Sequence, residues 1–289
     1  MMSYISRNSS LARILNSVRF INTSSSKSPV ENDDLTIVSE NDGVREIQLN
    51  RPKTRNPLSM AMMESILNGI TKNVSDEALR CIVISSTGPV YSAGHNLNEL
   101  KPEKGPDCQR EVFDKCAELI HKIQKAPVPI IAKVDGLAAA AGCQFVASCD
   151  LLICTERSSF STPAANFGIF CHTPAVAISR VMPRMKSSYM LFTGFPISAK
   201  DAYISGLVSE VCENDKLDEE VNKICDSIKS KSRPVIQLGK EFYYNQMGLN
   251  LSDAYVKASE VMVKNLGLND GKEGLNSFLE KRKPKWSHS

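Results

Sequence analysis

The spacing of apolar positions along the chain predicts a layered α/β core. Short apolar runs, which are typical of buried strands, alternate with stretches whose apolar residues recur on one face of a helix. In the segment 111–125, Val112, Cys116, Leu119 and Ile123 share such a face. The predicted strands are 36–50 (two strands around a turn at 41–43), 80–86, 127–134, 151–155 and 159–161. The predicted helices between them are 59–74, 111–125, 143–148 and 173–182. Strands that alternate with helices indicate an α/β fold.

The pattern becomes helical after Pro196, where we expect only one more strand, at 208–211. The predicted helices of this part are 198–205, 217–230, 234–245, 252–266 and 270–281. We therefore divide the chain into a leader at 1–30, a core at 31–196 and a C-terminal helical region at 197–289. A helical region that follows an α/β core is often a lid or an oligomer contact.

The basic residues of this chain are concentrated in its first 30 positions, which hold four Arg or Lys residues and no acid. Removing that stretch turns the net charge from +3 to −1, so the body is nearly neutral and we expect no nucleic-acid partner. Leu11, Ile14, Leu15 and Val18 share one helical face of the same Ser-rich stretch. This composition predicts a mitochondrial transit peptide at 1–30, and the alternative is a disordered basic tail.

The remaining composition excludes several classes of protein. The nine cysteines are scattered, with no Cys-x-x-Cys pair, so we expect reduced core thiols rather than a disulfide framework. With four histidines and no zinc-type spacing, we expect no metal site. The chain contains no uninterrupted apolar run long enough to span a membrane.

Two segments carry most of the candidate chemistry, 91–97 and 135–144. Each places small residues where a strand is expected to turn into a helix, and such a turn leaves backbone N–H groups free to face a ligand. Two of these donors that face one carbonyl oxygen would form an oxyanion hole. The alternative for the second segment is a tight helix-packing site.

Over residues 35–286 the chain resembles the crotonase, or enoyl-CoA hydratase/isomerase, superfamily. The motifs that carry the resemblance are LNRPK at 49–53, YSAGH at 91–95, PIIAKVDG at 129–136, GC at 142–143, CD at 149–150, FS at 160–161, FTG at 192–194, ISA at 197–199, GLV at 206–208 and FLEKR at 278–282. The resemblance implies a spiral of ββα units, a C-terminal helical trimerisation region, and a homotrimer or a dimer of trimers. It also implies an acyl-CoA thioester as ligand, with no separate cofactor because CoA is part of the substrate.

The resemblance also assigns roles to single residues. The two oxyanion donors are the backbone amides of His95 and Ala141. The positions that match the family's CoA contacts are Lys53, Arg55, Ala93, Leu97, Phe278 and Lys281.

The chain departs from the family where hydratases use two glutamates, because it has Gln144 at one position and Ala164 at the other. Glutamine can orient water but cannot titrate, and alanine can do neither. General acid–base groups contribute about 10²–10⁴-fold each, so hydration and isomerisation by the usual mechanisms are in doubt. The imidazoles of His95 and His172 are candidate replacements, and the alternative is that each is an ordinary surface or hydrogen-bonded histidine.

Three hypotheses about function remain open. The first is an enoyl-CoA hydratase-like lyase of fatty-acid metabolism in the mitochondrial matrix. The second is a decarboxylase of methylmalonyl- or ethylmalonyl-CoA, because the segment 91–97 resembles the corresponding turn of methylmalonyl-CoA decarboxylases, although Cys171 stands where such enzymes have a tyrosine. The third is a non-catalytic protein that binds or senses acyl-CoA.

Overall fold

The computed structural model describes residues 34–288, and these build two β-sheets. The strands of the larger sheet are, in spatial order, β1 (Thr36–Asn41), β2 (Val44–Leu49), β3 (Cys81–Ser86), β5 (Ile130–Val134), β7 (Leu151–Thr155) and β10 (Glu210–Cys212). The strands of the smaller sheet are β4 (Val90–Ser92), β6 (Leu137–Ala139), β8 (Ser159–Ser161) and β9 (Ile197–Ser198). The pairs β1–β2 and β8–β9 are antiparallel, and the other pairs are parallel.

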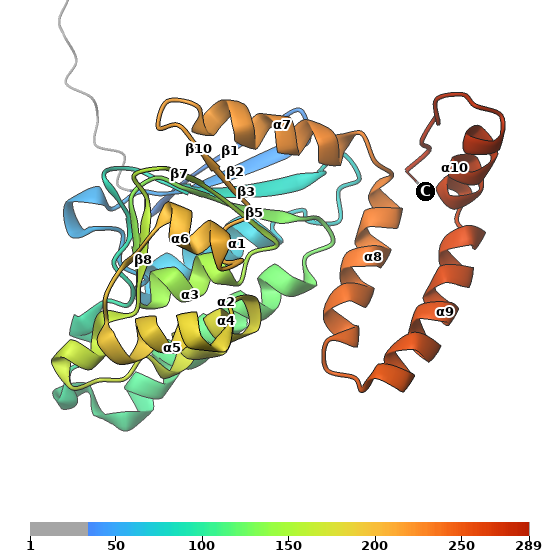
Figure 1. Cartoon of the computed structure of the whole chain (residues 1–289). Coiled ribbons are helices and arrows are strands. Elements are labelled where there is room, and N and C mark those ends of the chain that lie inside the picture. The colour runs from blue at the N-terminus through green and yellow to red at the C-terminus, as the bar shows by residue number, and fades with distance from the viewer. Residues whose placement is uncertain (1–33, 289) are drawn as a thin grey trace, which may run out of the picture. The chain divides into compact units, whose positions relative to one another are not determined.

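The chain winds between the two sheets in a repeating order of strand, strand and helix. It passes through β3 and β4 before α2 (Gly105–Lys125), through β5 and β6 before α3 (Ala141–Ala147), and through β7 and β8 before α4 (His172–Val181). Each turn therefore adds one strand to each sheet and one helix beside them (Figure 1). This is the spiral of ββα units that the resemblance implied, and the predicted α/β class is confirmed.

The other helices surround this spiral and extend beyond it. They are α1 (Met60–Thr71), α5 (Arg184–Thr193), α6 (Ala199–Ile204), α7 (Leu217–Lys229), α8 (Arg233–Gln246), α9 (Leu251–Gly267) and α10 (Asn269–Leu279), with short 3₁₀ segments η1 (Pro52–Thr54), η2 (Leu97–Glu99), η3 (Pro102–Lys104) and η4 (Pro163–Phe167). α1 begins where the sequence predicts, because the Ser59 hydroxyl accepts a hydrogen bond from the Met62 amide at 3.1 Å. Figure 1 shows α9 and α10 on the far side of α8 from the sheets.

The main core lies between the sheets and the helices α1 to α4. Ile47, Ile84, Tyr91, Phe145 and Phe160 are among its fully buried side chains. A second, smaller cluster lies where α7 covers the outer face of the large sheet. Apolar side chains therefore pack against both faces of the large sheet. This packing fixes the strands and the positions of the loops that follow them.

The apolar pattern misses four elements of the structure. The strands β4, β6 and β9 have only two or three residues each, which is too short for a period to be visible. α5 buries only Ser187, Met190 and Leu191, so its sequence has no apolar stripe. α2 begins at Gly105, six residues before the predicted start at 111. Pro106 and Asp107 favour a helix start there, but this first part of the helix is polar and has no apolar period.

The contacts place Asp34–Ser289 in one unit, so the boundary that we set at 196 stays a prediction. The predicted transit peptide at 1–30 lies outside the described residues, so it stays a prediction. None of the helices between residues 34 and 288 has the length and apolarity that crossing a bilayer requires.

A buried ion pair anchors α8 to the core. The Lys240 ammonium lies 2.6 Å from Asp150 Oδ2 and also donates to the carbonyls of Ile123 and Val128. Asp150 in turn accepts from the Tyr244 hydroxyl at 2.8 Å and from the Ile130 amide at 2.6 Å. The burial of Lys240 lowers its pKa, and the neighbouring Asp150 carboxylate partly offsets that shift. The network thus joins α8 to the end of α2 and to β5.

Replacing Lys240 with methionine should reduce the free energy of unfolding by about 3–5 kcal/mol, because it leaves a buried carboxylate and two carbonyls without their cation. Urea denaturation followed by circular dichroism measures this loss. The matched control is Lys257→Met, since Lys257 pairs with Glu260 on the surface and should change stability by no more than about 0.5 kcal/mol. Equal losses in the two variants would contradict the anchoring role.

Candidate active site: an apolar pocket between two strand-end loops

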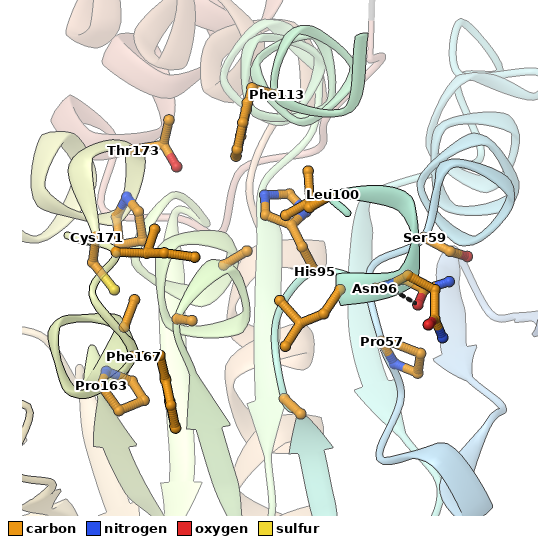
Figure 2. Close-up of a pocket in the computed structure, with 18 of the residues that line it drawn as sticks. Pro57, Ser59, His95, Asn96, Leu100, Phe113, Pro163, Phe167, Cys171 and Thr173 are labelled. Atoms are coloured by element: carbon orange, nitrogen blue, oxygen red, sulfur yellow. Dashed lines mark hydrogen bonds between the residues drawn. The ribbon is translucent and has the colours of Figure 1, made fainter. Parts of the chain in front are cut away.

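A pocket of about 1080 Å³ opens where the strands of the smaller sheet end. Its walls come from the loop before α1 and the first turn of that helix, from the segment after β4, and from helix α2. The start of α3 and the segment from η4 to α4 complete them. Figure 2 shows His95 and Phe113 across the pocket from Phe167 and Cys171. The lining residues are Leu35, Arg51, Thr54, Pro57, Ser59, Met62, Ala93, His95, Asn96, Leu97, Asn98, Leu100, Phe113, Ala140, Ala141, Pro163, Ala164, Phe167, Ile169, Phe170, Cys171, His172, Thr173 and Pro174.

The two loops predicted from the sequence are in contact at this pocket. Gly94 has φ +94°, and a Cβ atom built on it would lie 3.0 Å from the Ala139 carbonyl oxygen and 3.1 Å from the Ala141 nitrogen. A Cβ atom on Gly142 would lie only 2.6 Å from the Ser92 carbonyl oxygen. Only glycine fits either position without moving the opposite backbone. The close approach of these two backbone segments therefore explains why both loops contain small residues.

Ala140 has a strained backbone, with φ 50° and ψ −120°. The hydrogen bond from its amide to the Ser161 carbonyl and the bond from the Gln144 amide to its own carbonyl, 2.9 and 3.0 Å long, hold it there. Non-glycine residues in such regions cost about 1–3 kcal/mol and occur mostly at functional sites. Because Ala140 makes the sharp turn, Ala141 can begin α3 with its backbone at the pocket wall and without a positive φ of its own.

The amides of His95 and Ala141 have no hydrogen-bond acceptor among the residues that the structure describes. The backbone bonds from Ala93 to Arg55 and from Leu58 to Gly94, at 2.9 and 2.8 Å, fix the chain just before His95. Within residues 34–288, neither His95 N–H nor Ala141 N–H donates a hydrogen bond to another group. Both residues line the same pocket, and helix-start and turn amides without an internal acceptor are the groups that commonly bind ligands.

Buried polar atoms without a hydrogen-bond partner concentrate around this site. Among the described residues the buried side-chain atoms of this kind are His95 Nε2, Gln144 Oε1, Thr162 Oγ1 and Asn265 Oδ1. The first three belong to the oxyanion-candidate residue His95, to α3 and to the segment leading into η4. Native proteins leave few such groups unpaired, and those that remain commonly mark a site for water or a ligand.

The candidate residues divide into those that line the pocket and those that do not. His95, Ala141, Ala164, His172, Ala93 and Leu97 all line it. Gln144 is buried beside the pocket but does not line it, and among the described residues no Asp, Glu or Lys does. Residues 34–288 therefore contribute no carboxylate to this pocket wall that could act as a general acid or base.

The residues that the resemblance assigns to CoA are only partly gathered here. Arg51 and Thr54 line the pocket, whereas Lys53 and Arg55, which lie beside them in the chain, do not. Phe278 is 80% exposed at the end of α10, and it and Lys281 lie outside the pocket of their own chain. No group of three or more His, Cys, Asp or Glu side chains that could hold a metal ion occurs in the part of the chain that the structure describes.

Several pocket residues were not candidates from the sequence. Phe113 interrupts the polar face of α2, and its exposure could only be interpreted once the pocket was known. Arg51 belongs to the loop that the motif pointed to, but the residues named there, Lys53 and Arg55, do not line the pocket. Ala140 carries no signal, because a strained φ cannot be read from an alanine.

Replacing Gly94 with alanine should separate the two loops, because the new Cβ meets the backbone of Ala139 and Ala141. The affinity for a short acyl-CoA, measured by calorimetry, should fall by roughly tenfold or more, since a shift of about 1 Å in a site is enough to disturb it strongly. Gly105→Ala is the control: Gly105 has a similar positive φ of +77°, but no atom lies within 4 Å of its added Cβ. Equal affinities in the two variants would contradict the role of the contact.

The comparisons with known proteins agree with this architecture. A family model described as enoyl-CoA hydratase/isomerase matches residues 39–289. The enoyl-CoA hydratase domain-containing protein 3, mitochondrial, of Xenopus laevis is 49% identical over 271 residues, which cover 94% of this chain and 91% of the relative. The human protein of the same name is 50% identical over 247 residues, which cover 86% of this chain and 82% of the relative.

Solved structures give the same result. The crystal structure of human enoyl Coenzyme A hydratase domain-containing protein 3 superposes with a TM-score of 0.86 and 48% identity, covering 88% of this chain and all of that one. An enoyl-CoA hydratase from Mycobacterium smegmatis superposes with a TM-score of 0.85 and 36% identity, covering 88% of this chain and 99% of that one. These matches, together with the ββα spiral and the pocket between its loops, show that the chain belongs to the enoyl-CoA hydratase/isomerase family.

Proposed function

We propose that this protein binds an acyl-CoA thioester and stabilises negative charge on the thioester oxygen with the amides of His95 and Ala141. The observation that supports the proposal is that His95 and Ala141 line one pocket and that neither amide has an acceptor within residues 34–288. A thioester enolate concentrates its charge on one oxygen, and two preorganised donors stabilise that charge as it develops. Losing one such donor typically costs about 2.7–4 kcal/mol.

The CoA part of the ligand extends toward the loop that contains Lys53 and Arg55 and along the backbone at Ala93 and Leu97. Arg51 and Thr54, from the same loop, already form part of the pocket wall. The acyl part lies against the apolar side chains of the opposite end, such as Phe113 and Phe170. This arrangement supports a ligand with a polar carrier and a hydrocarbon chain.

We further propose that the site is completed in a homotrimer or a dimer of trimers. α9 exposes Tyr255, Val256 and Val263, and α10 exposes Phe278, each by more than 60%. Large exposed apolar faces of this kind are typical of protein–protein contacts. In such an assembly Phe278 and Lys281 would meet the ligand of a neighbouring copy. The relatives that are named mitochondrial support a mitochondrial protein, which we place in the matrix and in fatty-acid metabolism.

The proposed site resembles that of an enoyl-CoA hydratase in its oxyanion donors, but it has neither of the two glutamates that serve as acid and base in the hydratases. Ala164 occupies one glutamate position on the pocket wall, and Gln144 occupies the other behind it. Proton transfer to or from carbon therefore has no carboxylate to perform it. We propose oxyanion stabilisation as the step that this chain retains.

Decarboxylation of a malonyl-type thioester is the second candidate, favoured by the lack of carboxylates among the described residues of the pocket wall. Loss of CO₂ leaves the electron pair of the broken C–C bond on the thioester as an enolate, so this step needs no base. It needs the same two amides, and the enolate then takes a proton from solvent.

A panel of acyl-CoA thioesters, incubated with the protein and analysed by mass spectrometry, tests these proposals. Bound butyryl-CoA without turnover would support binding alone, a mass gain of one water on crotonyl-CoA would support hydration, and loss of CO₂ from methylmalonyl-CoA would support decarboxylation. If no thioester binds even at millimolar concentration, the proposed function is wrong.

Restoring the missing carboxylates should create hydratase activity. Ala164→Glu places a carboxyl group on the pocket wall, and we expect it, combined with Gln144→Glu, to raise the hydration rate of crotonyl-CoA by roughly a hundredfold or more. The loss of ultraviolet absorbance of the conjugated enoyl thioester measures the rate. Ala165→Glu is the control, because that neighbouring residue is exposed and outside the pocket. A double variant no faster than this control would contradict the assignment of the two positions.

A further inference from the structure

Three of the nine cysteines lie together beneath α7, the helix that covers the outer face of the large sheet (Figure 1). Cys81 is the first residue of β3, Cys212 is the last residue of β10, and Cys225 is buried on the inner face of α7. All three belong to the small apolar cluster that joins this helix to the sheet. The cluster is separate from the pocket, because none of its residues lines the pocket wall.

Cys81 and Cys225 are direct neighbours within this cluster. The two thiols hydrogen bond to each other, and each is the largest single influence on the pKa of the other. Both residues are free cysteines, and at most 1% of either is exposed. A disulfide forms where two sulfur atoms approach each other from facing stretches of backbone, and β3 and α7 provide such a pair. The thiol of Cys212 is engaged elsewhere, because it donates to the Cys154 carbonyl at 3.5 Å.

The surroundings favour Cys225 as the attacking thiolate. The hydrogen bond from the Cys81 thiol lowers the pKa of Cys225, and the nearby Lys229 ammonium lowers it further, against the opposing effect of burial. In contrast, burial raises the pKa of Cys116 and Cys143 to about 12. Because the thiolate and not the thiol attacks a disulfide, Cys225 is more reactive than these two core cysteines.

A local opening of α7 is enough to give a small reagent access to this pair. The helix buries only the side chains of Leu217, Val221 and Cys225. Cys225 lies four residues before the end of the helix at Lys229, whose side chain is 22% exposed. Helix ends open at a much lower free energy than the whole domain. Fraying of this end therefore exposes Cys225 while the sheet stays folded.

We propose that Cys81 and Cys225 form a redox-sensitive modification site, at which a low-molecular-weight disulfide such as oxidised glutathione converts the two thiols into a reversible disulfide between β3 and α7. The site does not depend on the proposed binding of acyl-CoA.

The reaction proceeds by two thiol–disulfide exchanges. The Cys225 thiolate attacks one sulfur of oxidised glutathione, so that a mixed disulfide forms, the S–S bond of the reagent breaks and one glutathione thiolate leaves. The Cys81 thiol gives its proton to that leaving thiolate or to water and then attacks the Cys225 sulfur. This second step releases the other glutathione. Two protein thiols are thus oxidised by two electrons, and one oxidised glutathione is reduced to two molecules of glutathione.

The bond would link parts of the chain that are far apart in sequence. The loop closed between residues 81 and 225 contains most of the ββα spiral. A crosslink across a long loop restricts the unfolded chain and thereby stabilises the folded one. Oxidation at this site therefore fixes α7, and the start of α8 that follows it, to the large sheet.

Incubation of the folded protein with oxidised glutathione, without denaturant, tests this proposal. We expect the intact mass to fall by the mass of two hydrogen atoms with no glutathione retained, and peptide mapping to identify a bond between Cys81 and Cys225. The melting temperature should rise by roughly 5–10 °C, as a disulfide that closes a long loop predicts for a domain of this size. Dithiothreitol should reverse both changes.

Two variants locate the effect. Cys225→Ala removes the attacking thiol and should show neither the bond nor the rise in melting temperature. Cys212→Ala is the matched control, because it removes another buried cysteine of the same cluster and should behave like the native protein.

The native chain alone can overturn the proposal, so the test does not depend on the folding of either variant. Unchanged mass after oxidation, glutathione retained on Cys225, or a bond mapped to another pair of cysteines would each contradict it. The same holds for a bond that forms only in urea, because the reaction would then belong to the unfolded chain.

Discussion

The site depends on one steric constraint, the contact between two backbone segments that belong to adjacent strands of the small sheet. β4 and β6 pair in parallel with an irregular register, and the backbone segments that follow these strands meet at Gly94 and Gly142 with no room for a Cβ atom. The contact lies beside His95 and Ala141, which both line one pocket. The strain of Ala140 is a consequence of the same constraint, since the chain must turn sharply within one residue after β6. The surrounding core holds this strain in place, and the unfolded chain is free of it.

The described pocket wall contains no Asp, Glu or Lys side chain. Backbone amides are fixed dipoles that keep the same charge at every pH, and the His95 ring is held neutral by its burial. In the proposed function the two amides stabilise charge on the ligand, whereas no carboxylate among the described pocket residues is available to transfer protons.

The sequence predicted the large elements and the two loops, and it failed where the determining interactions are short or conformational. The strands of the large sheet and most helices have clear apolar periods, and Ser59 capped α1 as expected. β4, β6 and β9 have no visible period, although they form the sheet on which the site is built. The glycines indicated where the backbone needed space, whereas the strain at Ala140 and the unpaired Nε2 atom of His95 depend on φ and on ring orientation, which no residue type specifies.

The predicted CoA contacts show a second limit of sequence analysis. A sequence does not specify whether a residue contacts the ligand of its own chain or that of a neighbouring copy. The family motif names Phe278 and Lys281 as ligand contacts, yet both lie away from the pocket of their own chain. The buried pair of Lys240 and Asp150 fixes α8 against the core and thereby fixes the base from which α9 and α10 extend. A rigid base is what a helical region needs if its exposed apolar faces are to meet the same surface of every neighbouring copy. If those residues complete the pocket of another copy, ligand binding and assembly are linked, and each must stabilise the other.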